Sequence, residues 1–121
     1  YWSGGQMFLG GIDSDYKAAI FSGTANDCEV ETAELEPFPG LRANITGVRP
    51  IVDATATLTV KSRERLADSE SATSSVSMVN SGINPVRKSG RYVRANVKVP
   101  SGTTFTHAQG IDLIASRAGT R

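Results

Sequence analysis

The chain of 121 residues is 39% hydrophobic and 21% charged, proportions that fit one globular domain and argue against a wholly disordered chain. Its 13 basic and 12 acidic residues leave a net charge of +1, which gives no reason to expect bulk attraction to nucleic acid or to an anionic membrane. A single cysteine, Cys28, excludes an internal disulfide and a multi-cysteine zinc site. No apolar run approaches the roughly 18 residues of a membrane-spanning helix.

The first residues, YWSGGQMFLGG, are apolar and rich in glycine. We interpret residues 1–11 as continuing from a preceding structured region, so residues 1–121 are expected to be one domain that forms the C-terminal part of a longer chain. Next, GIDSDY places Asp13 and Asp15 two residues apart beside Tyr16. This is a faint calcium-binding pattern that a solvated turn explains better, and no metal site is expected.

Alternation of apolar and polar residues with a period of two dominates the rest of the chain. It is clearest in TATLTVKS (55–62) and in YVRANVKV (92–99), which we predict to be half-buried antiparallel strands. Weaker strand patterns are KAAIFSG (17–23), CEVETAEL (28–35), LRANITGV (41–48), SSVSMVN (74–80) and GIDLIAS (110–116). The one helix candidate, SRERLADSES (62–71), has a single strong apolar residue, so we expect a polar loop there.

Turn signals separate these runs, at PFPG (37–40), SGINP (81–85) and PSG (100–102). Short strands with regular turns predict an all-β fold, an antiparallel β-sandwich with a jelly-roll-like order. Within it, VPSGTTFTHAQGID (99–112) is interpreted as a hairpin.

Two charged stretches stand out. The acidic one is EVETAELE (29–36), in which an exposed strand with like charges would protect a sheet edge; a partner-binding stripe is the alternative. The basic one comprises Arg87, Lys88, Arg91, Arg94 and Lys98. A basic strand face that also carries Tyr92 favours a protein interface over nucleic acid, because arginine and tyrosine anchor interfaces and one tyrosine is no stacking platform.

The only histidine, His107, lies near Ser101 and Asp112 in the sequence, so the three residue types of a nucleophilic triad are present. Ser101, however, sits in a Pro-Ser-Gly turn without a strand-to-helix elbow. We therefore expect His107 to bond backbone in a turn, and we expect neither a catalytic site nor a cofactor.

Several stretches together resemble the C-terminal β-sandwich region of tailed-bacteriophage virion proteins. They are WSGGQMFLGG (2–11), VRPIVD (48–53), RERLAD (63–68), GRYVR (90–94), VPSGTTFTHAQGID (99–112) and the final Gly-x-Arg, and they run along nearly the full chain. The sequence departs from that pattern at Phe105, where tryptophan would be expected.

The resemblance implies a structural and assembly module of a tail hub, stopper or packaged-DNA-stabilisation protein, made in the bacterial host cytoplasm and located in the virion tail. The implied partners are other virion proteins and further copies of the full-length chain, with neither a membrane nor nucleic acid. The expected contact residues are Tyr92, Arg94, Lys98, Phe38 and Phe105.

The short run RYVR before a polar-tipped turn also resembles galactose-binding jelly rolls, which suggests an alternative function, carbohydrate binding for adsorption to a host glycan. The candidate residues are Asp13, Asp15 and Tyr16, and an aromatic platform would need Tyr16, Phe38 and Phe105 to come together.

Overall fold

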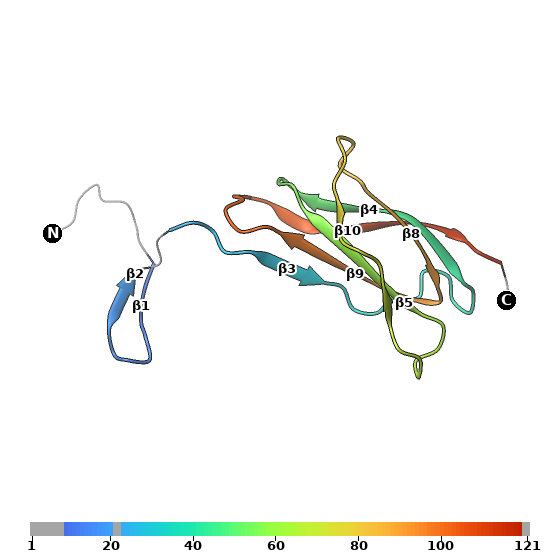
Figure 1. Ribbon diagram of the computed structural model, residues 1–121, viewed down its shortest axis with the longest axis horizontal. Helices are drawn as coiled ribbons and strands as arrows, with labels where there is room; N and C mark the ends of the chain where they lie inside the picture. The colour runs from blue at the N-terminus through green and yellow to red at the C-terminus, as the bar shows by residue number, and fades with distance from the viewer. Residues whose placement is uncertain (1–8, 21–22, 120–121) are drawn as a thin grey trace.

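The computed structural model describes residues 9–20 and 23–119, and within these ranges it contains strands and no helix (Figure 1). The strands are β1 (Gly10–Ile12), β2 (Ala18–Ile20), β3 (Cys28–Glu31), β4 (Ala43–Val52), β5 (Thr57–Arg63), β6 (Ser71–Ala72), β7 (Val76–Ser77), β8 (Asn84–Gly90), β9 (Tyr92–Val99) and β10 (Ala108–Arg117). Over the described residues there is no helix of the length and apolar character needed to cross a membrane. Most of the expected structured region at residues 1–11 lies outside the described residues.

Two antiparallel sheets pack face to face. One has three strands in the order β10-β4-β8, and the other has the order β3-β9-β5-β6, with β7 also pairing with β5. The core lies between them, where Ile45 and Val48 of β4 meet Leu58 and Val60 of β5 and Val93 of β9, all nearly or fully buried. The predicted antiparallel β-sandwich is confirmed, whereas its jelly-roll order remains a prediction.

The two clearest predicted strands are confirmed with their inward faces. In β5 the buried hydrophobic residues are Leu58 and Val60, preceded by buried Ala56; in β9 they are Val93, Ala95, Val97 and Val99. Each inward residue is followed by an outward one because successive side chains of a strand point to opposite faces. The segment 62–71 contains no helix, as expected, and it turns at Asp68, whose N–H donates to the Arg65 carbonyl.

The expected hairpin over residues 99–112 is wrong. The strands on either side of the turn belong to different sheets: β9 pairs with β3 and β5, while β10 pairs with β4 along nearly its whole length. The connection therefore crosses from one sheet to the other. It carries residues 101–107 over the end of the sandwich, and Phe105 in this connection lines an opening between the sheets.

The β1–β2 hairpin stands apart from the sandwich (Figure 1). Gly10 pairs with Ile20 and Ile12 with Ala18. The turn between them is tied by Asp13, whose Oδ1 accepts the N–H groups of Asp15 and Lys17, each at 2.9 Å. The predicted solvated turn therefore lies at the tip of the hairpin.

Candidate functional site

The predicted basic face of β9 is already neutralised within the chain. Glu31 of β3 lies between two cations, 3.0 Å from Lys61 Nζ and 3.3 Å from Arg94 Nη1. Arg94 also reaches Glu70 at 3.5 Å, and Lys98 pairs with Asp27 at 2.7 Å. Part of the acidic stretch and part of the basic stretch thus meet on the outer face of the sheet that contains β9. We call the paired side chains there the ladder; they are Asp27, Glu31, Glu34, Lys61, Arg63, Glu70, Arg94 and Lys98. Such a face gives phosphate little uncompensated positive charge to bind.

The ladder shifts the pKa of its members toward their charged forms. The hydrogen bond from Lys61 lowers the pKa of Glu31, the hydrogen bond from Arg63 lowers that of Glu34, and the hydrogen bond from Lys98 lowers that of Asp27. Arg63 and Glu34 form the best-aligned pair, with Nε to Oε1 at 2.6 Å and Nη2 to Oε2 at 2.5 Å. Bidentate pairs of this kind fix geometry as well as charge, so the ladder holds β3 against its sheet.

Asn96 lies on the outward face of β9, as predicted, yet only 9% of it is exposed. Its Nδ2 donates to Glu29 at 2.7 Å and to Glu31 at 3.3 Å, so the glutamates cover it. The acidic stretch was expected to protect an edge, and β3 is indeed an outer strand of its sheet. Glu29 and Glu31 of β3 also accept hydrogen bonds from Asn96 of the neighbouring strand β9.

The predicted contact and sugar-binding aromatics do not come together. Tyr16 is at the tip of the hairpin, 91% exposed and in a left-handed conformation with φ of 62°. Phe38 precedes β4 and packs partly buried against the core. Phe105 precedes β10, whose start pairs with the end of β4, so it lies at the opposite end of the sandwich from Phe38. Asp13 is engaged in the hairpin turn with Asp15 beside it, so these aspartates and the three candidate aromatics do not share one surface.

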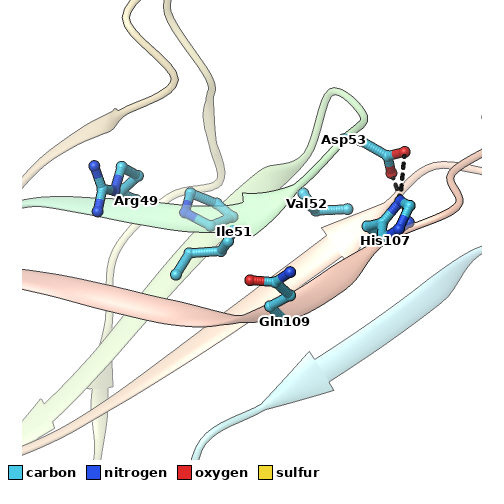
Figure 2. Close-up of a pocket in the computed structure, with 7 residues that line it drawn as sticks. Arg49, Ile51, Val52, Asp53, His107 and Gln109 are labelled. Atoms are coloured by element: carbon cyan, nitrogen blue, oxygen red, sulfur yellow. Dashed lines mark hydrogen bonds and ion pairs between the residues drawn. The ribbon is translucent and has the colours of Figure 1, made fainter.

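His107 has a carboxylate partner, but it is Asp53 and not Asp112. Asp53 Oδ1 accepts the His107 backbone N–H at 3.0 Å, and the Asp53 backbone N–H donates to the His107 carbonyl at 3.1 Å (Figure 2). The Thr106 hydroxyl donates to Asp53 Oδ2 at 2.5 Å and lies 2.8 Å from His107 Nδ1. These bonds fasten the β9–β10 connection to the end of β4, and we call this set of bonds around Asp53 the staple. His107 directly precedes β10, and its ring lies beside side-chain oxygens of Thr106 and Asp53, whereas the bonds in this turn are made by its main chain.

Asp53 is held ionised by this arrangement. The hydrogen bond from the Thr106 hydroxyl, together with the backbone N–H of His107, lowers the pKa of Asp53 from 3.8 to about 2. A carboxylate that accepts several N–H and O–H donors is stabilised in its charged form. The predicted grouping of His107 with Asp112 does not occur, because Asp112 is paired with Arg49 at 2.5 Å.

A shallow hollow of about 500 Å³ lies beside this staple on the outer face of β4 and β10. Figure 2 shows that Arg49 and Ile51 come from β4, while Gln109 comes from β10 and His107 directly precedes that strand. The described residues contain no group of three or more histidine, cysteine, aspartate or glutamate side chains that could hold a metal ion. The polar side chains that line the hollow include Arg49, which is paired with Asp112, and His107. They do not form a recognisable binding site for a particular ligand.

A second opening lies between the two sheets and is apolar. The edge strands β3 and β10 belong to different sheets and do not pair, so the inner faces of both remain open between them. One end of this opening is a cavity of about 190 Å³, lined by residues that include Cys28, Val30, Val97, Phe105 and Ile111. We call this opening the seam. Val30 points inward opposite Val97 yet is 55% exposed, so the core is incompletely covered here.

The hairpin supplies the other uncovered apolar surface. Ile12 and Ile20 lie diagonally on one face, because Gly10 faces Ile20 and Ile12 is two residues further along β1. Ile12 is 75% and Ile20 61% exposed. An isolated two-stranded hairpin is marginally stable in water.

The sequence predicted the strand at 17–23 but not its partner β1 or the seam. The seam depends on which strands lie at the sheet edges, which local patterns do not report.

Searches against protein-family models, curated proteins and solved structures found no match to this chain.

Proposed function

We propose that this chain is a structural module that assembles through protein–protein contacts, with the β1–β2 hairpin as its attachment arm. The observation that supports the proposal is the hairpin's exposed apolar face, formed by Ile12 and Ile20, on an element set apart from the core. Exposed apolar surface of this kind marks interaction sites in stable proteins. A hairpin that covers no part of its own core gains little from folding unless something else covers it.

The proposed setting is the tail or the portal-proximal region of a bacteriophage virion, where the module would contact further copies and other virion proteins. The sequence resemblance alone supports this setting. The geometry adds a preference for protein over nucleic acid as the partner, because the basic side chains of β9 are paired with Glu31, Glu70 and Asp27.

Of the five predicted contact residues, Phe105 keeps the best geometry for a role in assembly. It lines the seam and is 37% exposed. Arg94 and Lys98 are engaged in the ladder, and Phe38 packs against the core. Tyr92 is half-buried at the start of β9, in register with Arg63 of β5. The proposed contact surface therefore moves from the outer face of β9 to the hairpin and the seam.

Sedimentation velocity over a concentration series tests the proposal. The 121-residue chain should associate as its concentration rises, and the double variant Ile12→Asp/Ile20→Asp should stay monomeric. The matched control is Ala19→Asp, which adds a carboxylate to the opposite face of the same hairpin and should associate like the unmodified chain. A chain that is monomeric at every concentration, or a double variant that associates normally, would contradict the proposal.

A further inference from the structure

The hairpin and the seam are both apolar and both uncovered, although they belong to the same chain. The inference drawn from this pair rests on the proposed function and adds to it the place where the hairpin binds. The cavity at the end of the seam is lined by Cys28, Val30, Phe105 and Ile111 among others, and none of its lining residues is charged. Side chains such as those of Ile12 and Ile20 match this lining in chemistry.

The seam is also flanked by strand edges that are open to further pairing. β3 and β10 are the outermost strands of their sheets, so each has one edge without a partner strand among the described residues. A free edge presents N–H and C=O groups that a further strand can satisfy. The β3 edge carries Glu29 and Glu31 on its outward face, whereas residues 108–111 at the start of β10 carry no charge. The edge of β10 is therefore the better place for a strand to add.

Ala25 and Asp27, which precede β3, are fixed to the end of their own sandwich. The N–H of Gly102 donates to the carbonyl of Ala25 at 2.8 Å, and Lys98 pairs with Asp27 at 2.7 Å. The hairpin projects away from the sandwich (Figure 1), and the cavity at the end of its own seam is unfilled. This direction presents Ile12 and Ile20 to another molecule.

We propose that the β1–β2 hairpin of one copy docks in the seam of a second copy, with Ile12 and Ile20 directed between the sheets and a hairpin strand added to the free edge of β10. A reciprocal exchange would close a two-fold dimer, and a one-way exchange would build a ring or an open chain of copies. In either arrangement, Cys28 of the receiving copy is covered by the hairpin of the other.

Complementation between two defective variants tests this docking. The hairpin variant is Ile12→Asp/Ile20→Asp, which keeps its seam. The seam variant is Val30→Asp in a Cys28→Ser background, which keeps its hairpin. Phe105→Asp in the same background is a second seam variant from a different segment, in case Val30→Asp disturbs the pairing of β3. Leu66→Asp is the matched surface control, because Leu66 is exposed in the β5–β6 connection and does not line the seam.

Each defective variant alone should sediment as a monomer, and an equimolar mixture should form a one-to-one complex that grows no further. Only the hairpin variant carries a thiol in that mixture. The rate at which Cys28 reacts with a thiol reagent should therefore fall as more seam variant is added. The Leu66→Asp chain should associate like the unmodified chain.

Three results would overturn the docking. Seam variants that associate as strongly as the unmodified chain would place the hairpin elsewhere, and the proposed function would stand. A mixture that stays monomeric while the unmodified chain associates would also show that the hairpin does not bind in the seam, and the proposed function would again stand. A monomeric unmodified chain whose Cys28 reacts faster once Ile12 and Ile20 are replaced would show that the hairpin folds onto its own seam, and both proposals would then fail.

Discussion

Gly90 at the end of β8 lies directly against Ser62 of β5, at a point where the two sheets come together. A Cβ atom at position 90 would lie 2.8 Å from the Cβ of Ser62 and 3.0 Å from its Oγ. Ser62 is itself buried, and its Oγ donates to the carbonyl of Ser89 at 3.1 Å. The absence of a side chain at position 90 therefore lets β8 and β5 approach closely enough to form this hydrogen bond. The contact closes the side of the sandwich that lies away from the seam.

Gly90→Ala should destabilise the fold by about 1–3 kcal/mol, since an inserted methyl group in a tight contact forces the neighbouring backbone to move. Urea unfolding at a fixed protein concentration measures this loss. The matched control is Gly110→Ala in β10, where an added Cβ meets nothing within 4 Å. Because Gly110 lines the seam, both variants are compared in the Ile12→Asp/Ile20→Asp background, which is expected to be monomeric. That control should be neutral or stabilising by up to about 1 kcal/mol. Equal unfolding midpoints for the two variants would contradict the close approach.

The staple at Asp53 should loosen only in strong acid. Because the pKa of Asp53 falls from 3.8 to about 2 in the folded chain, its contribution to stability is fully present above the ordinary value and is lost as the pH falls through about 2. The amide resonances of Thr106 and His107, which donate to Asp53, should titrate together with a midpoint near that lower pKa. Asp53→Asn should remove this transition from both amides. A midpoint at the ordinary aspartate value would show that the staple does not form.

Glu31→Gln should weaken the ladder in a salt-dependent way. Glu31 binds both Lys61 and Arg94, and its side chain is 28% exposed, so the pairs are partly shielded from solvent. The expected loss is at most about 1 kcal/mol at low ionic strength, as for other pairs near a surface. Added salt should reduce the difference from the unmodified chain, because mobile ions screen exposed charges. A loss that is unchanged at high salt would point to the hydrogen bond with Asn96 as the main interaction of Glu31.

The sandwich could be predicted because its strongest strands carry a local signal. In residues 55–62 and 92–99 the apolar residues alternate strictly, and the structure buries the expected face of each. Strand β8 was missed because its run NPVRKSG includes Pro85 and only one apolar side chain that reaches the core, Val86. A proline followed by a basic, mostly polar run is typical of a loop, so the local pattern did not predict this strand.

The pairings between distant segments could not be predicted. A connection that crosses between sheets has the same strand-turn-strand pattern as a hairpin, so β9 and β10 appeared paired when they lie in different sheets. The acid beside His107 is Asp53, more than fifty residues earlier, and not the nearby Asp112. The acidic and basic stretches could each be seen, but their meeting depends on the antiparallel register of β3 with β9.

The most direct test of the central claim is hydrogen exchange of the amides in residues 9–20, followed at several protein concentrations. The hairpin has little reason to be stable unless another copy covers Ile12 and Ile20. The account predicts that the amides of β1 and β2 are protected at high concentration and lose this protection on dilution, while those of β5 and β9 stay protected throughout. Exchange of the hairpin amides at the rate of an unfolded peptide at every concentration would contradict it.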